Sequence, residues 1–433
     1  MSTIVVLFTR DLRLSDHPAL HAAVAEADRV VPLFVLDPAL LRVSARNRIA
    51  YLVEALAELR TLLRERGGDL VVRRGDTAAE TARVVAETAA RAVHLSEDVG
   101  AVAVRRERRL SQAVGASGAR LRTFPGVTVV PPGSLRPAHG DHYRVFTPYL
   151  RAWESARWRA PLPAPERIAL PDALAPGPLP GPDLVRTGIG VLSPHRPRGG
   201  AGAARARLRA WLSAAAHARG RPGSSAAEED SRLGCHLRFG CVSPLEAALL
   251  ARDRPHGAAF LRRLALRDFH HQTARAFPRL NRVDCRPGPT RWRRDDSGFA
   301  AWCSGTTGVP IVDAGMRQLL REGYLPGRVR TIAAAYLTRV LRIHWKRGAD
   351  HFHSLLVDGD VAVNYGNWQQ VAGTGGVPRP AHRFDPLRQA RRYDPDGVYV
   401  RRHVPELRGI AGGQVHDPPL PRPGGYPPPL SRP

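Results

Sequence analysis

Short apolar runs alternate with longer amphipathic stretches over the N-terminal part of the chain. Four runs have the length of buried strands, and these are Ile4–Phe8, Val30–Leu36, Leu70–Val72 and Ala92–Leu95. Between them the apolar positions recur every three or four residues, most clearly over Arg46–Arg66, and this spacing predicts amphipathic helices. Alternating strands and helices predict a parallel sheet covered on both faces, so we expect an α/β domain over residues 1–130.

The hydrophobic pattern changes further along the chain. From residue 131 to 200 proline and glycine are dense, which predicts an inter-domain linker with one short helix near Pro148–Arg159. Residues 201–410 have a helical period and predict an all-helical second domain. Residues 411–433 are again rich in proline and glycine, and we expect a loose tail there.

The first domain is Rossmann-like in its order of strands and helices. No G-x-G-x-x-G motif follows the first predicted strand. A standard dinucleotide site at that strand is therefore not expected.

The chain carries a formal net charge of +26, from 65 basic and 39 acidic residues. A surface this basic attracts polyanions, and nucleic acid is the first candidate. Lys346 is the only lysine, and alanine, glycine and proline are abundant. A compositional bias of the genome is therefore an alternative source of part of the charge.

Cysteine content and the N-terminus indicate a cellular compartment. The four cysteines form no C-x-x-C pair, which indicates reduced thiols rather than a disulfide framework. Arg10, Asp11 and Arg13 interrupt the first apolar run too early for a signal peptide. No stretch of about 18 apolar residues could cross a membrane. We therefore expect a cytoplasmic protein.

Three segments carry polar clusters of chemical interest. Thr9–Leu20 (TRDLRLSDHPAL) is a charged loop that by itself indicates salt bridges at the carboxyl end of the sheet. Ser231–Pro244 (SRLGCHLRFGCVSP) places Arg and Ser beside a glycine that opens a helix, which can bind phosphate or simply cap the helix. Val357–Trp368 (VDGDVAVNYGNW) lacks the Gly and Glu of a calcium loop, which leaves an Asx turn that caps a helix.

No metal site is expected from the adjacent histidines His270 and His271 in the segment RDFHHQ. Neighbouring positions diverge on a helix. No Cys, Asp or Glu at a matching spacing accompanies them, so the metal interpretation is set aside.

The most specific motif is Thr307–Leu319 (TGVPIVDAGMRQL). It resembles, nearly residue for residue, the T-G-x-P-x-V-D-A-x-M-R-Q-L string of the photolyase/cryptochrome family. Thr9–Leu20 resembles the opening R-D-L-R and D-N-P-A-L of that family, with His17 in place of asparagine. Ser231–Gly234 resembles the T-S-R-L-S segment, and Val357–Trp368 resembles the D-x-D motif followed by asparagine.

This resemblance covers about residues 4–20 and 230–410, and implies that the helical domain holds FAD. The residues implied at the cofactor are Ser231, Arg232, Leu233, Gly234, Arg267, Arg330, Asp358, Asp360 and Asn364. The first four would hold the pyrophosphate. Asp358 would pair with Arg330 beside the isoalloxazine, and Asn364 would approach flavin N5 and tune its redox state. Asp230 replaces the family's threonine, and a carboxylate near phosphates is unfavourable unless it points away.

Three tryptophans of the helical domain, Trp292, Trp345 and Trp368, resemble the family's electron-transfer chain. Indole is among the more easily oxidised side chains, so such a series could carry an electron from the surface to excited flavin. A role in the hydrophobic core is the alternative for tryptophans in a helical domain.

The resemblance implies a light-driven carbon–carbon lyase that repairs pyrimidine dimers in DNA. The lesion would be drawn out of the stack, and reduced FAD would supply an electron on excitation that returns after the cyclobutane bonds open. The expected partner is damaged duplex DNA, bound by a monomer. The alternative is a cryptochrome-like blue-light photoreceptor with little or no repair.

The lesion side departs from the family's repair enzymes, and this favours the alternative. Arg263 and Leu266 replace a glutamate and a tryptophan, Gly327 replaces an asparagine, and Gln370 replaces a second tryptophan. Each lost aromatic platform removes roughly 1–3 kcal/mol of base stacking. Arg263 and Arg328 are suited to phosphate and, with Gln370, are the residues expected at DNA.

A second, light-harvesting chromophore is also implied by the resemblance. Family members that bind a folate carry Asn-Glu in the helix after the fourth strand, where this chain has Val104 and Arg105. A deazaflavin is therefore favoured over a folate, or the antenna site holds no chromophore.

Overall fold

The computed structural model describes residues 1–217, 230–254, 257–287, 291–376 and 384–430. These residues form two compact units. The first comprises Met1–Ile189, Arg198–His217 and Leu233–Pro278, and the second comprises Gly190–Pro197, Ala218–Arg232 and Arg279–Pro433. The helices that follow residue 200 are thus divided between the units.

The first unit contains a five-stranded parallel sheet of order β3-β2-β1-β4-β5. The strands are β1 (Thr3–Leu7), β2 (Arg29–Leu36), β3 (Val71–Arg74), β4 (Ala92–Ser96) and β5 (Arg120–Phe124). In the central strand Val5 lies opposite Val31 of β2 and Val93 of β4. All three side chains are fully buried, as expected for a parallel sheet covered on both faces.

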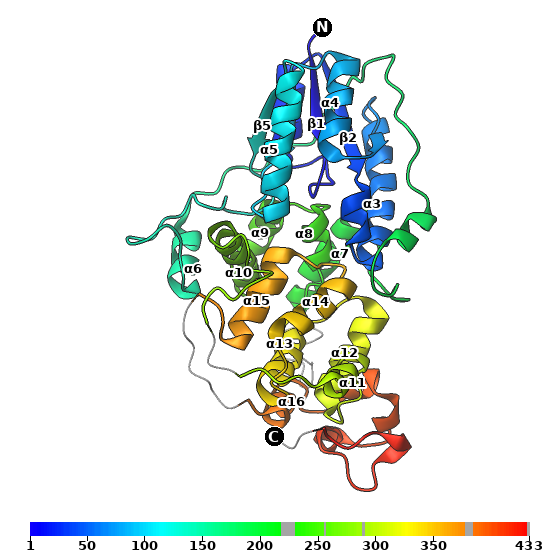
Figure 1. Ribbon diagram of the computed structural model, residues 1–433, viewed down its shortest axis with the longest axis vertical. Coiled ribbons are helices and arrows are strands. Elements are labelled where there is room, and N and C mark those ends of the chain that lie inside the picture. Colours follow the sequence, from blue (N-terminus) through cyan, green and yellow to red (C-terminus); the bar gives the residue numbers. More distant parts are fainter. Residues whose placement is uncertain (218–229, 255–256, 288–290, 377–383, 431–433) are drawn as a thin grey trace. The chain divides into compact units, whose positions relative to one another are not determined.

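Ten helices accompany this sheet in the part of the first unit that is described. They are α1 (Pro18–Glu26), α2 (Pro38–Arg42), α3 (Arg46–Arg64), α4 (Thr77–Thr88), α5 (Ala101–Ala116), α6 (Phe146–Ser155), α7 (Ala201–His217), α8 (Gly234–Phe239), α9 (Pro244–Arg252) and α10 (Gly257–Ala276), with a 3₁₀ turn at Pro182–Thr187. Figure 1 shows α4 and α5 running alongside the sheet. Their apolar sides, including Val84 and Leu110, join the core of β1, β2 and β4.

The sequence pattern predicted four of the five strands and missed β5. As an edge strand, β5 pairs only with β4. Its residues RLRTF remain largely exposed and alternate with arginine, so they form no continuous apolar run. The α/β class and the predicted helix at Arg46–Arg66 are confirmed, the latter as α3.

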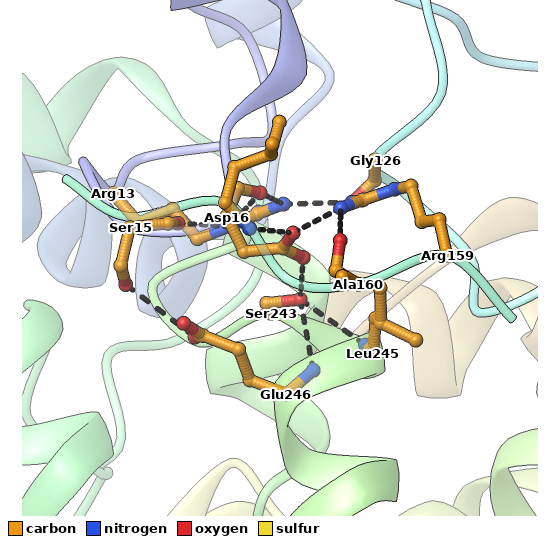
Figure 2. Close-up of polar contacts among 10 residues, drawn as sticks. Arg13, Ser15, Asp16, Gly126, Arg159, Ala160, Ser243, Leu245 and Glu246 are labelled. Carbon is orange, nitrogen blue, oxygen red and sulfur yellow. Dashed lines mark hydrogen bonds and ion pairs between the residues drawn. The ribbon is translucent and has the colours of Figure 1, made fainter. Parts of the chain in front are cut away.

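The charged loop after β1 forms ion pairs, but mainly with distant parts of the first unit (Figure 2). Arg13 is fully buried and donates to the carbonyl oxygens of Asp16 at 2.8 Å, Gly126 at 2.9 Å and Gly240 at 3.1 Å. The Asp16 carboxylate accepts from the Ser243 hydroxyl and from Arg159. The loop therefore ties the sheet to α9, and the side chains of Arg13 and Asp16 bind these distant partners rather than each other.

His17 explains how the loop tolerates the loss of the family's asparagine. Its Nδ1 accepts from the backbone N–H of Leu20 at 3.1 Å and so caps α1. Its Nε2 lies 3.1 Å from the Asp11 carboxylate. Burial alone raises the pKa of Asp11, but His17 and the hydrogen bonds from Ser96 and Thr9 outweigh it and lower the pKa to about 2.

Asp268 of α10 organises the packing of the segment after β5. Its Oδ2 accepts from the backbone N–H groups of Val129 and Val130 at 3.0 and 3.1 Å, and from Trp153 Nε1 at 3.0 Å. The residue is fully buried, and this burial raises its pKa to about 6 in spite of Arg267 and the three donors.

Asp268 is expected to make stability fall as the pH rises from about 4 to about 6. In this window the folded state keeps a proton that the unfolded chain has released, so the free energy of unfolding drops by up to roughly 3 kcal/mol. Asp268→Asn removes the titration and keeps an oxygen for the three donors. Denaturant unfolding of both proteins across this range is the measurement, and parallel pH profiles would contradict the expectation.

The second unit is helical where it is described. Its elements are α11 (Asp296–Ser304), α12 (Pro310–Glu322), α13 (Gly327–Ala335), a π-helical turn (Tyr336–Val340), α14 (Trp345–Leu355), α15 (Val361–Ala372), α16 (Pro386–Tyr393), α17 (Val398–His403) and short 3₁₀ turns at Pro405–Leu407, Gly412–His416 and Pro423–Gly425. Together with the sheet-containing first unit this confirms an α/β part followed by helices.

The specific motif at the start of α12 is an anchor for the C-terminal segment. The buried Asp313 carboxylate accepts from the N–H and hydroxyl of Thr307, the N–H of Gly308 and the Tyr426 hydroxyl, at 2.6 to 3.0 Å. Tyr426 itself is buried. The expectation of a loose tail is therefore wrong for the described residues around Tyr426. Besides the Tyr426 hydroxyl, Arg422 Nη1 donates to the Gly308 carbonyl oxygen and the Leu430 N–H donates to the Thr307 carbonyl oxygen, each at 3.0 Å.

Candidate functional site

A half-buried ion pair joins α13 to the turn before α15 in the second unit. Arg330 Nη2 donates to Asp358 Oδ2 at 2.7 Å, and Arg330 Nε donates to the carbonyl oxygen of Leu325 at 2.8 Å. Burial lowers the pKa of Arg330, but Asp358 outweighs it and the pKa is raised. The predicted pairing of Arg330 with Asp358 is confirmed.

Asp358 keeps one oxygen for a ligand. Its side chain is 10 % exposed, and Oδ1 is buried without a hydrogen-bond partner among the described residues. An unpaired buried acceptor is costly, so such a group calls for a donor.

Tyr324 lies between two arginines of the same unit. The guanidinium carbons of Arg232 and Arg330 are 4.9 and 5.7 Å from its ring centroid. Its hydroxyl donates to the Asp230 carboxylate, and burial, followed by Asp230, raises the pKa of Tyr324 well above its usual value. Arg232 also pairs with Glu322 at 2.8 Å. The Asp230 carboxylate thus accepts a hydrogen bond from a neutral phenol. This contact explains how the structure accommodates an acidic residue at this position.

The start of α15 carries two of the predicted residues. Asp360 caps the helix, accepting from the Val363 N–H at 3.0 Å, as the Asx-turn interpretation predicted. Asn364 is buried and its Nδ2 donates to the carbonyl oxygen of Ala349 at 3.0 Å. This hydrogen bond fixes the orientation of the Asn364 amide.

The three predicted tryptophans all belong to the second unit. Trp345 is fully buried and donates from Nε1 to Asp284 at 2.7 Å. The His344 ring lies between Trp345 and Trp292, with centroid distances of 5.7 and 5.1 Å. The Trp368 ring packs on Gly348 of α14, one turn after Trp345, where any side chain would clash with it. The structure thus brings the three indoles to one helix.

The other predicted residues lie elsewhere. Leu233, Gly234 and Arg267 belong to the first unit, where Arg267 Nη1 donates to the Val127 carbonyl oxygen at 2.7 Å. Arg263 is exposed on α10 of that unit. Arg328 is exposed at the start of α13, and Gln370 is half-buried on α15.

Sequence reasoning missed two aromatic residues of the second unit. Tyr324 contacts Asp230, which precedes it by 94 residues, so only the fold joins them. Trp302 is fully buried and its ring centroid lies 6.0 Å from that of Trp368. The one sequence signal for Trp302 is its position just before the specific motif Thr307–Leu319. An isolated tryptophan there is equally typical of a hydrophobic core.

Among the described residues no group of three His, Cys, Asp or Glu side chains could hold a metal ion. No helix in the described ranges combines the length and apolar character needed to cross a bilayer.

The second unit fits part of a flavin. The unpaired Oδ1 of Asp358 can accept from a ring N–H. Arg232 and Arg330 both flank the Tyr324 ring, and each is already paired with a carboxylate, Glu322 and Asp358 respectively.

Comparison with known proteins identifies the family of the chain. The family profile "DNA photolyase" matches residues 4–166, and "FAD binding domain of DNA photolyase" matches residues 260–425. The deoxyribodipyrimidine photo-lyase of Streptomyces griseus is 46 % identical over 96 % of this chain and 92 % of its own length. Cryptochrome DASH of Natronomonas pharaonis is 34 % identical over 96 % and 93 %.

Among solved structures, an archaeal photolyase from Sulfolobus tokodaii with two FAD molecules aligns with a TM-score of 0.84. It is 28 % identical, over 99 % of this chain and 96 % of the other. The fold and the matched profiles define an FAD-binding flavoprotein with an α/β part. The chain belongs to the photolyase/cryptochrome family.

Proposed function

We propose that this protein repairs pyrimidine dimers in DNA by light-driven electron transfer from reduced FAD. The observation that carries the proposal is the Arg330–Asp358 pair with its unpaired carboxylate oxygen, inside the segment that matches the FAD-binding domain of DNA photolyase. When bound and fully reduced, FAD supplies an electron to the lesion on excitation and recovers it afterwards.

The residues of the protein are proposed to hold and orient the flavin. Arg330 fixes Asp358 so that Oδ1 is the acceptor presented to the flavin ring. The Ala349 carbonyl oxygen fixes the Asn364 amide, which would approach flavin N5 and tune which redox state persists. The segment Ser231–Gly234, with Arg267 and Asp360, is proposed to complete the binding of the cofactor.

Trp368, Trp345 and Trp292 are proposed to return oxidised flavin to its active state. Trp345 is held at Nε1 by Asp284, and a carboxylate beside an indole stabilises the positive charge that develops when the ring loses an electron. His344 fills the space between Trp345 and Trp292.

The DNA partner is supported by an arginine surface on α16 and α13. The guanidinium carbons of Arg328 and Arg392 lie 4.4 and 5.6 Å from the ring centroid of Tyr393. Arg388, Arg391 and Arg392 are exposed at helical neighbour positions. None of these arginines forms an ion pair with a carboxylate in the described ranges, so their charge is available for phosphate. Arg263 and Gln370 are proposed as further DNA contacts.

Replacing Arg391 and Arg392 together with Ala is expected to weaken DNA binding without changing lesion preference. Two lost phosphate contacts should lower the slope of log K against log salt by up to about 2. Fluorescence anisotropy with damaged and intact duplexes over a salt series measures this. The control is Arg83→Ala, an exposed arginine that already pairs with Glu80 at 2.6 Å. An unchanged slope in the double variant would remove the arginine surface from the DNA interface.

The lesion pocket differs from that of the family's dimer-repair enzymes at Gly327 and Gln370. No heavy atom of the described structure lies within 4 Å of where a Cβ at Gly327 would be, so this part of α13 is open. We propose that phosphate contacts offset the missing side chains.

Illumination of the reduced holoprotein with a dimer-containing oligonucleotide tests the function. Recovery of pyrimidine absorbance, absent in the dark, is the expected result. Photoreduction of the flavin and DNA binding without such recovery would replace repair by the cryptochrome-like photoreceptor.

A second chromophore is proposed at the carboxyl end of β4. Arg106 of α5 has Nε and Nη2 buried without hydrogen-bond partners in the described structure. Burial lowers its pKa, although Asp98 and Glu107 raise it. Val104 and Arg105, which stand where folate-binding members have Asn-Glu, lie on the same helix. A deazaflavin remains our proposal over a folate, and the visible spectrum of the purified protein identifies the chromophore.

We also propose that the protein acts as a cytoplasmic monomer. We propose the following division along the chain: an α/β domain at 1–130, a linker at 131–200, an FAD domain at 201–410 and a Pro/Gly-rich tail at 411–433 that Tyr426 anchors.

A further inference from the structure

Tyr365 of α15 contacts two groups that make it suitable for oxidation. Its hydroxyl donates to Asp350 Oδ1 of α14 at 2.8 Å. Its ring meets Trp345 edge to face, with a centroid distance of 6.4 Å and an interplanar angle of 82°. This distance lies within the range of interacting aromatic pairs. The phenol therefore connects a member of the tryptophan chain to a carboxylate.

The ring of Tyr365 is buried, whereas its proton acceptor, Asp350, is exposed to solvent. Tyr365 is 6 % exposed and Trp345 is fully buried, whereas the Asp350 side chain is 46 % exposed. An electron can thus move between two enclosed rings, while a proton that reaches Asp350 passes to solvent. Lys346 binds the other oxygen of Asp350, which keeps Oδ1 turned towards Tyr365.

A tyrosine gives up an electron readily only when its proton leaves with it. Asp350 Oδ1 lies within the hydrogen-bond reach that proton transfer requires. The His353 ring, with a centroid 5.6 Å from that of Tyr365, is the other titratable ring beside the phenol ring. The hydroxyl itself points to Asp350.

We propose that Tyr365 is a redox-active residue that re-reduces Trp345 after Trp345 has lost an electron to the flavin. One electron moves from Tyr365 to the tryptophan radical cation, and the phenolic O–H bond breaks as its proton binds Asp350 Oδ1. The products are neutral Trp345, a neutral tyrosyl radical and a protonated Asp350, so charge and electrons balance. The proposal rests on the proposed photoreduction through Trp368 and Trp345.

This step gives the series of tryptophans a second terminal electron donor besides Trp292. The route to Trp292 passes His344, whereas Tyr365 meets Trp345 directly. The phenolic proton passes to Asp350 and then to water. Electron transfer back to the tyrosyl radical requires that a proton return to the phenolic oxygen. The reduced flavin should therefore persist longer than it would with tryptophan alone.

Flash photolysis of the full-length, FAD-loaded protein without DNA tests the proposal, with transient absorption and electron paramagnetic resonance as readouts. Tyr365→Phe and Asp350→Asn are the two variants. The asparagine keeps an oxygen for the hydrogen bond but cannot take the proton. Tyr143→Phe, a change in the first unit, is the control, and ring-deuterated tyrosine assigns the radical through its narrowed spectrum.

In the unaltered protein and in Tyr143→Phe, a tyrosyl signal is expected to rise as the tryptophan signal decays. In Tyr365→Phe and Asp350→Asn the tryptophan signal should last at least about tenfold longer, without a tyrosyl signal. Tryptophan lifetimes that are the same in all four proteins would overturn the role of Tyr365 and leave the tryptophan chain intact. Absence of any tryptophan radical in the unaltered protein would overturn both.

Discussion

Asp358→Ala is expected to purify without flavin and to lose about 3 kcal/mol of stability. The change leaves the half-buried Arg330, whose side chain is 24 % exposed, without its anion, and removing one partner of an enclosed pair costs more than the pair itself contributes. It also removes the carboxylate oxygen that we propose accepts from the flavin ring. The ratio of FAD to protein and the free energy of unfolding of the apoprotein are the two measurements.

Asp296→Ala is the matched control for this prediction. Asp296 also pairs with an arginine, Arg347, at 2.8 Å, but its side chain is 64 % exposed. An exposed pair contributes about 0–1 kcal/mol, so this variant should keep its flavin and nearly all of its stability. A full complement of FAD in Asp358→Ala would remove the Arg330–Asp358 pair from the cofactor site.

Trp368→Phe is expected to slow photoreduction of the oxidised flavin by at least about tenfold, equivalent to ~1.4 kcal/mol in activation free energy. Phenylalanine fills most of the space on Gly348 but is much harder to oxidise than indole. Loss of oxidised-flavin absorbance under blue light with an external reductant measures the rate.

Repair by chemically reduced enzyme distinguishes the role of the tryptophans in photoreduction from the chemistry at the lesion. It should be retained in Trp368→Phe, because that reaction does not need the tryptophans. Trp211→Phe, a half-buried tryptophan of the first unit, is the control and should photoreduce normally. A photoreduction rate in Trp368→Phe equal to that of the control would contradict the proposed chain.

Local pattern was a good guide where one element could be recognised from its own residues. The apolar runs of β1, β2 and β4 could be predicted because burial on both faces demands continuous apolar residues, and β3 could be predicted because its first half, Val71 and Val72, is buried. The edge strand β5 could not, since exposure permits alternating arginine. The pairing of Arg330 with Asp358 came from family resemblance, and the geometry then confirmed it.

Contacts between segments that are distant along the chain could not be predicted from the sequence. The loop after β1 looked like a self-contained set of ion pairs, but Arg13 and Asp16 bind partners more than a hundred residues away. Tyr426 in the expected loose tail is held by Asp313. In each case a charged or phenolic group is buried, and only the folded chain decides which partner satisfies it.

The sequence by itself determined the two-part architecture, the family and the types of side chain available to a flavin and to DNA. These follow from hydrophobic period and from motifs that depend on neighbouring residues. The tertiary structure alone decided which oxygen of Asp358 is left for a ligand, how Tyr324 engages Asp230, and that Tyr365 lies between Trp345 and Asp350. Hydrogen bonds and ring contacts act over a few ångströms, so they depend on packing that brings distant positions together.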